Sequence, residues 1–146
     1  MKRLVTNDRV RVGAWVAQRI GRGTPWVEEA ALGLENDAGE LVAGVVLSDY
    51  RARASGSLHC AGVGKYWLNR EFLFAVFDYV FNQLDLKVLL NTVAGSNADS
   101  IRFTRHIGFS EVHRVPRGWD GEVDMILFQL CRDECRWLSG ERYAIR

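Results

Sequence analysis

The chain has 146 residues, of which 48% are hydrophobic and 25% are charged, and its formal net charge at pH 7 is +1. This composition indicates a single domain over residues 1–146 with a real hydrophobic core, and the near-zero charge argues against a protein that coats nucleic acid. The sequence has no signal-peptide pattern and no apolar run of about 18 residues, so we expect a cytoplasmic protein that does not span a membrane.

Cysteine usage indicates neither a disulfide framework nor a metal centre. Cys60, Cys131 and Cys135 are odd in number and lack the paired spacing of zinc ligands. We therefore expect three free thiols and no bound metal.

The first part of the chain predicts a strand followed by a helix. Residues 3–6 are typical of a short strand, and Asn7 or Asp8 can cap a helix that runs to about Ile20, before the glycine-rich stretch 21–23. One side of this helix carries four apolar residues, Val12, Trp15, Val16 and Ile20.

Three strands are predicted next. Glu28–Glu35 and Leu41–Tyr50 read as two strands, and the sequence Asn-Asp-Ala-Gly at 36–39 is typical of the turn that joins them into a hairpin. Ser57–Val63 is a further strand that contains small residues.

The clearest helical pattern covers Asn69–Leu84. Asn69 is a good N-terminal cap, and apolar residues recur at every fourth position, namely Phe72, Val76, Val80 and Leu84. The helix has the length of a right-handed crossover, so we expect the strands on either side of it to be adjacent and parallel.

The segment that follows joins a buried strand to a helix that stops at a glycine. Lys87–Ala94 is a short apolar strand, Ser96 or Asn97 can cap the helix, and Gly108 suits its left-handed end. Ser100, Phe103 and Ile107 share one face of this helix. Its other face carries Arg102, Arg105 and His106.

Two further strands, Phe109–Val115 and Val123–Leu130, complete the pattern. An order of strands first and then alternating helices and strands predicts one mixed α/β sheet with helices on both faces.

The stretch from Thr92 to Phe109 resembles the CoA-side helix of the GNAT superfamily of N-acyltransferases. It has the strand, an Asn at the helix start, a small polar residue three positions later, and the ending Ile-Gly-Phe. The resemblance extends over about residues 41–138. Further matches, at 65–73, 79–84, Asp124 and 135–138, look like a GNAT subgroup often found in phage and prophage genomes.

This resemblance implies a fold and a reaction. The fold is a single mixed sheet of about six or seven strands with helices on both faces and two splayed central parallel strands. The reaction is transfer of an acetyl group from acetyl-CoA, without a metal, to a primary amine of a small molecule or a protein by direct attack. The resemblance also allows a homodimer, and a phage-encoded enzyme would act in the host cytoplasm.

The CoA-binding residues that the resemblance implies lie on three elements. The pyrophosphate loop falls near Lys65, Asn69 and Arg70, although Leu68 and Asn69 stand where the family has glycines, so the charges of Lys65 and Arg70 would replace part of the backbone contact. The backbone N–H of Val63 or Cys60 would point at the acetyl and pantetheine groups. Asn97, Ser100 and Phe103 complete the predicted set.

The catalytic groups follow less directly from the resemblance. Many members carry a Tyr acid four residues before the helix-ending Gly, where this chain has Thr104, which leaves Ser100 as the hydroxyl facing the same way. His59 is the best candidate for the base, because imidazole titrates near neutral pH. Carboxylates or a phenol acting through water are alternatives, at Glu28, Glu29, Asp49 and Tyr50.

Two other functions stay open at this point. A GNAT-fold enzyme that modifies DNA or tRNA bases is suggested by basic residues in one region, namely Arg102, Arg105, His106, His113, Arg114 and Arg117. A non-catalytic relative that binds CoA or a partner is the other alternative.

Overall fold

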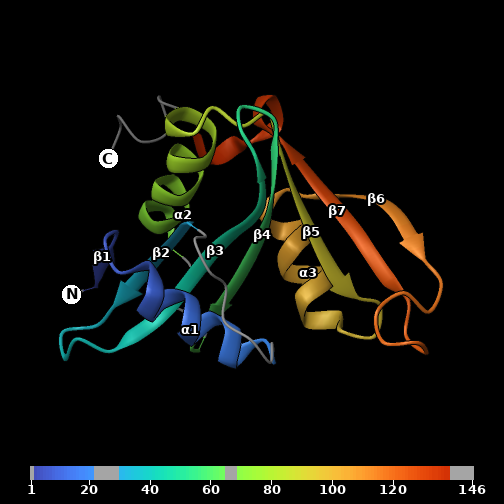
Figure 1. Cartoon of the computed structure of the whole chain (residues 1–146), viewed down its shortest axis with the longest axis horizontal. Coiled ribbons are helices and arrows are strands. Elements are labelled where there is room, and N and C mark those ends of the chain that lie inside the picture. Colours follow the sequence, from blue (N-terminus) through green and yellow to red (C-terminus); the bar gives the residue numbers. More distant parts are fainter. Residues whose placement is uncertain (1, 22–29, 65–68, 139–146) are drawn as a thin grey trace.

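A computed structural model describes residues 2–21, 30–64 and 69–138 of the chain. Its centre is one seven-stranded mixed sheet with the strand order β1-β2-β3-β4-β5-β7-β6 (Figure 1). The strands are β1 (Arg3–Val5), β2 (Ala30–Glu35), β3 (Leu41–Arg51), β4 (Ser55–Gly62), β5 (Val88–Ala94), β6 (Ser110–Val115) and β7 (Met125–Cys131). The predicted mixed sheet is confirmed, and the hairpin β2–β3 is antiparallel as expected.

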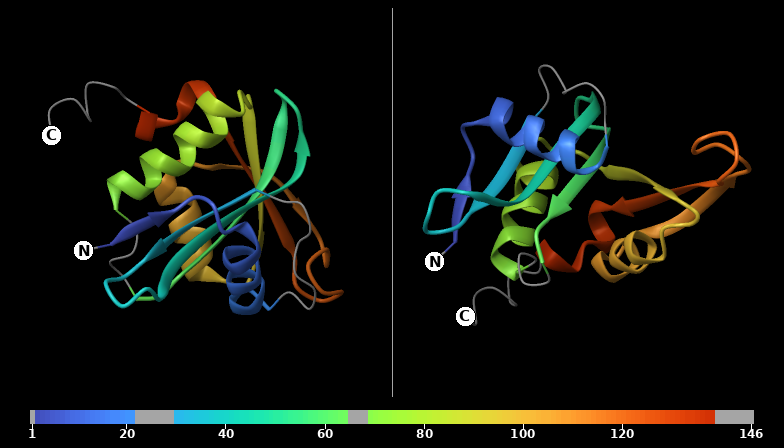
Figure 2. Two further views of the ribbon diagram at one scale, coloured as in Figure 1. Left: turned by 60° about the vertical axis from the view of Figure 1, so that its left-hand side comes forward. Right: turned by 90° about the horizontal axis from the view of Figure 1, so that it is seen from below.

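One face of β2, β3 and β4 is covered by helix α1 (Arg9–Arg19) (Figure 2). Two glycines paired across β2 and β3 allow this close approach. A Cβ atom on Gly33 would lie 2.8 Å from Val12 Cγ2, and one on Gly44 would lie 2.6 Å from Val16 Cγ2. Val12 and Val16 are fully buried as predicted, whereas Ile20, expected on the same side, is 43% exposed because the helix ends at Arg19.

The opposite face of the sheet is covered by α2 (Arg70–Phe77) and α3 (Ala98–Ile107) (Figure 2). Both helices pack into the main hydrophobic core, which includes Phe72, Phe77, Ile107 and Phe128. Two short 3₁₀ turns, Arg132–Glu134 and Arg136–Leu138, follow β7, and the indole N–H of Trp137 donates to the Ile107 carbonyl at 2.7 Å.

The predicted helix Asn69–Leu84 changes its type halfway. Asn69 caps it, because its Oδ1 accepts from the Phe72 N–H at 2.8 Å, but after Phe77 the chain continues as a π-helix, η1 (Asp78–Gln83). The i, i+4 apolar spacing that predicted one α-helix is also compatible with a final wider turn. The predicted helix is therefore confirmed over its whole length, and the change to a π-helix at Asp78 is a feature that the pattern did not predict.

β4 and β5 are adjacent and parallel, as predicted, but they pair over a short distance only. Their register consists of Ser55↔Val88, Gly56↔Leu89 and Ser57↔Leu90. Beyond these pairs the two strands diverge (Figure 1). We call Leu58–Gly62 of β4 together with Asn91–Ala94 of β5 the splay, and the three registered pairs the paired end.

All three cysteines are free thiols. Among the described residues, no helix is long and apolar enough to cross a membrane.

Candidate functional site

The backbone of β4 presents alternate amides to its two neighbouring strands. This alternation distinguishes the two backbone N–H groups, of Val63 and Cys60, that were predicted to point at the acetyl group. The N–H of Val63 donates to the carbonyl of Val42 on the β3 side at 2.8 Å. By alternation the Cys60 N–H faces the β5 side, where the registered pairing has already ended at Ser57. Of the two candidates, only Cys60 directs its amide into the splay.

The side chains of His59 and Cys60 lie on opposite faces of the sheet. His59 is paired with Val46, which belongs to the cluster packed against α1, and its Nε2 lies 2.7 Å from the buried Ser48 Oγ. The Cys60 thiol instead packs against the core on the α2 and α3 side. Burial raises the pKa of the Cys60 thiol to about 12, so it stays protonated at neutral pH and is a poor nucleophile.

Two helix N-termini lie beyond the carboxyl ends of β4 and β5. Helix α2 follows β4 and begins after Asn69, and α3 follows β5 and begins after Asn97, whose Oδ1 accepts from the Ser100 N–H at 3.1 Å. Both helices therefore start at the edge of the sheet where the splay is widest, and helix N-termini favour anions. Ser100 and Phe103 are half-buried on α3, and Arg70 is exposed in the first turn of α2.

The hydroxyl of Thr104, at the position of the family's Tyr acid, is enclosed between α3 and the sheet. Thr104 is only 3% exposed, and its Oγ1 lies 3.4 Å from the Asn91 Nδ2 on β5. This position therefore serves packing, and Ser100 is the remaining hydroxyl on this helix.

One predicted site residue, Asp49, is not brought to the splay, and two others lie outside the described residues. Asp49 lies beside the paired end, at the register shift between Ser48 and Arg51, with φ of 50°. At about 3.3 Å per residue this position is roughly 13 Å along the strands from Cys60. Glu28, with its neighbour Glu29, and Lys65 lie outside the described residues.

Sequence reasoning missed two residues near the splay. Ser48 contacts His59 only because the register pairs Val46 with His59, which places Ser48 on the same face two residues away. Arg19, at the end of α1, donates to the carbonyl of Gly62 at 3.4 Å and stacks over the Trp15 ring at 5.0 Å. The only sequence signal for Arg19 was its place in the last helical turn.

Asp124 and much of the basic cluster have structural partners. The Asp124 carboxylate accepts from the Arg117 N–H at 3.0 Å, and its carbonyl accepts from the Gly95 N–H at 2.8 Å, which joins the ends of β5 and β7. The basic cluster includes three ion pairs, Arg102–Asp99, Arg105–Glu111 and Arg114–Glu111. In the described part of the chain, no group of three His, Cys, Asp or Glu side chains could hold a metal ion.

No protein-family model and no curated protein matches the sequence. Solved structures do match. A dodecameric spermidine N-acetyltransferase from Vibrio cholerae is 15% identical with a TM-score of 0.71, covering 90% of this chain and 94% of that one. A probable acetyltransferase is 20% identical with a TM-score of 0.63, covering 91% and 93%. A GNAT-family acetyltransferase from Bacillus anthracis is 17% identical with a TM-score of 0.58, covering 71% and 67%. The chain has the fold of the GNAT acetyltransferases.

Proposed function

We propose that this protein is an acetyl-CoA-dependent N-acetyltransferase that transfers the acetyl group directly to a primary amine. One observation carries the proposal. The amide of Cys60 is directed into the splay between two parallel strands, with the His59 imidazole on one face of the sheet and two helix N-termini at its edge. This arrangement supplies a hydrogen-bond donor and a base on β4, and an anion-binding edge at the starts of α2 and α3.

The described residues fit acetyl-CoA as a substrate. The unpaired side of β4 at Cys60 offers backbone groups to the pantetheine amides, as an additional strand would. The N-termini of α2 and α3 favour phosphate groups, and Asn97, Ser100 and Phe103 line the approach from α3. Arg70, together with Lys65 outside the described residues, would contribute positive charge to the pyrophosphate end.

The proposed chemistry needs three contributions from the chain. His59 takes the proton of the acceptor ammonium, so that the amine lone pair can attack the acetyl carbonyl carbon. The Cys60 N–H stabilises the negative charge that develops on the carbonyl oxygen while the new C–N bond forms. The C–S bond then breaks, and the nitrogen loses its second proton to water. The sulfur leaves with a proton from water, either directly or through the Ser100 hydroxyl, which water then reprotonates. The protonated Cys60 thiol supports direct transfer over an acyl-cysteine intermediate.

The acceptor is a primary amine of a small molecule or a protein. Spermidine, for which one of the similar enzymes is named, is a polycation whose recognition calls for several carboxylates. The splay segments Leu58–Gly62 and Asn91–Ala94 contain none, and Arg19 adds a positive charge beside them. We therefore do not extend the proposal to a polyamine.

The ion pairs in the basic cluster weigh against the nucleic-acid alternative, because the carboxylates of Asp99 and Glu111 offset two of the three positive charges on Arg102, Arg105 and Arg114. We keep three finer parts of the sequence interpretation as proposals: a cytoplasmic location, a homodimer and membership of the phage subgroup.

The purified protein tests this function directly. Mass spectrometry should detect co-purified CoA or acetyl-CoA, and incubation with acetyl-CoA and a panel of amines should produce free thiol together with an acetylated amine. CoA binding without thiol release for any amine would favour a non-catalytic relative. Salt-sensitive binding to a DNA or tRNA duplex without any CoA binding would instead favour the nucleic-acid alternative.

A further inference from the structure

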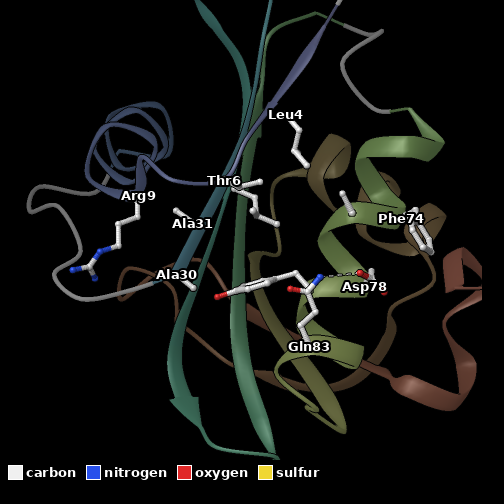
Figure 3. A pocket seen from close by; sticks show the side chains of 11 residues that line it. Leu4, Thr6, Arg9, Ala30, Ala31, Phe74, Asp78 and Gln83 are labelled. Carbon is white, nitrogen blue, oxygen red and sulfur yellow. Dashed lines mark hydrogen bonds between the residues drawn. The ribbon is translucent and has the colours of Figure 1, made fainter.

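A cavity of about 470 Å³ lies between β1 and β2 on one side and α2 with its π-helical end on the other. Its volume falls within the usual range of small-molecule sites. Most of its wall is apolar, with the residues Leu4, Ala30, Ala31, Leu32, Phe74 and Ala75. Polar groups come chiefly from the π-helical turn, through Asp78, Tyr79 and Gln83 (Figure 3).

The π-helical turn fixes the Asp78 carboxylate within this wall. Asp78 Oδ1 accepts from Asn82 Nδ2 at 2.9 Å, and Oδ2 accepts from Gln83 Nε2 at 3.0 Å. A wider turn brings the residue five positions later beside Asp78, which an α-helical turn would not do as well. Both donors are neutral amides. They orient the carboxylate without neutralising its charge.

No cation in the described part of the chain forms an ion pair with Asp78. Arg9 also borders the cavity, but its side chain is exposed and its guanidinium points away from Asp78 (Figure 3). The cavity therefore combines an apolar wall with one oriented, uncompensated carboxylate. A ligand with a hydrocarbon body and a single positive charge complements both features.

We propose that this cavity is a second ligand site, which binds a small monoamine with an apolar body through Asp78. It is separate from the splay. β3 lies between β2 and β4, so at about 4.8 Å per strand spacing the β2 wall is roughly 10 Å from β4. The site is built mainly from α2, η1, β1 and β2, with Thr6 and Arg9 at its border, and none of its residues belongs to the proposed acetyl-transfer site.

The test uses the full chain without acetyl-CoA, so that its result is independent of turnover. Binding of 3-phenylpropylamine at pH 7 is measured by isothermal titration calorimetry, beside the neutral 3-phenylpropan-1-ol as a shape-matched control. We expect saturable binding of the amine, and at least fivefold weaker binding of the alcohol. Equal affinity of the two compounds, or no saturable binding of the amine, would overturn the proposal.

Two variants locate the site. Asp78→Asn should weaken amine binding at least fivefold and leave alcohol binding unchanged. Ala75→Leu retains the charge, fills the cavity and suits a helix, so it should weaken both compounds. His59→Gln is the control at the splay and should leave amine binding unchanged. If His59→Gln abolishes binding while Asp78→Asn and Ala75→Leu do not, the amine occupies the acceptor site and the second site is refuted.

Discussion

The paired end and the splay of strands β4 and β5 differ in how their backbone groups are used. At the paired end, Ser55, Gly56 and Ser57 are registered with β5, and the neighbouring side chains Leu47 and Leu86 are buried. At the splay the same two strands have separated, and the Cys60 amide faces the space left by β5. The paired end thus stabilises the sheet, while the splay offers backbone groups to a substrate. Substitutions at the two ends should therefore separate stability from catalysis.

The largest effect is expected from removing the backbone donor at the splay. Cys60→Pro deletes the N–H that faces β5, and this N–H takes no part in the ladder to β3, so the sheet should still form. We expect kcat to fall about 10²- to 10³-fold, the usual cost of losing one oxyanion donor. Steady-state kinetics, with circular dichroism and a thermal melt to check the fold, measure both effects.

Two control variants accompany Cys60→Pro. Cys60→Ala keeps the N–H and should retain nearly full activity, since burial raises the pKa of the thiol and makes it a poor nucleophile at neutral pH. Ala61→Pro deletes an amide that alternation directs to β3, and the loss of this ladder hydrogen bond should cost about 1–3 kcal/mol of stability. A folded Cys60→Pro enzyme with normal kcat would remove the Cys60 amide from the mechanism.

The next largest effect is expected at His59, the proposed base, whose side chain lies on the face of the sheet opposite to the Cys60 thiol. His59→Gln should lower kcat/KM about 10²-fold and remove the acid limb of the pH–rate profile between pH 5.5 and 9. Ser48→Ala, which removes only the hydrogen-bond partner of the imidazole, should shift this limb without abolishing it. An unchanged profile in His59→Gln would remove His59 from the mechanism and leave Glu28 or Glu29, acting through water, as the remaining carboxylate candidates, because Asp49 lies roughly 13 Å along the strands from Cys60.

The edge of the splay should respond in ligand binding. Acetyl-CoA should raise thermal stability, because a ligand that binds only the folded chain adds about 2.7 kcal/mol at a hundredfold excess over Kd. Arg70→Ala and Lys65→Ala should each reduce the melting shift. Arg114→Ala is the charge-matched control, because the Arg114 guanidinium pairs with Glu111 on β6. This variant should leave the melting shift unchanged. No melting shift at millimolar acetyl-CoA would contradict CoA binding.

A substitution at the paired end should instead lower the free energy of unfolding and leave catalysis unchanged. A Cβ atom on Gly56 would lie 2.6 Å from Leu47 Cδ1 and 3.3 Å from Leu86 Cδ1, both in the core. Gly56→Ala should therefore cost about 1–3 kcal/mol in urea unfolding and leave the pH–rate profile unchanged. Thr92→Val, on the exposed surface of β5 at the splay, is the matched control and should change stability by less than about 0.5 kcal/mol. Equal losses in both variants would contradict the assignment of stability to the paired end.

The sequence predicts most of the fold, because its signals are local. Asn69 and Asn97 were identified as possible caps from their residue type and place, and both accept the expected backbone hydrogen bonds. The length of the helix after β4 predicted that β4 and β5 are parallel neighbours. The π-helical end was not predicted, because apolar residues at every fourth position do not distinguish a final wide turn from an α-helical one.

The details of the site depend on register, which the sequence does not encode locally. Cys60 and Val63 are equivalent candidates in the sequence, and only the pairing of β4 with β3 shows that the Val63 amide is already used. The contact between Ser48 and His59 follows from the same register. Charge patterns alone likewise could not show that Arg102, Arg105 and Arg114 are paired with carboxylates.

The smallest effect is expected at Ser100, the last hydroxyl available for the acid role on α3. If catalysis depends mainly on positioning and on the Cys60 amide, a side chain acting as general acid contributes little, because the departing CoA thiolate can take a proton from water. Ser100→Ala should then lower kcat less than about tenfold, and Thr104→Ala, enclosed beside Asn91, should affect stability more than rate. Single-turnover rates and melting temperatures of both variants distinguish these effects. A hundredfold loss in Ser100→Ala at unchanged stability would instead make Ser100 the acid and give α3 a direct chemical role.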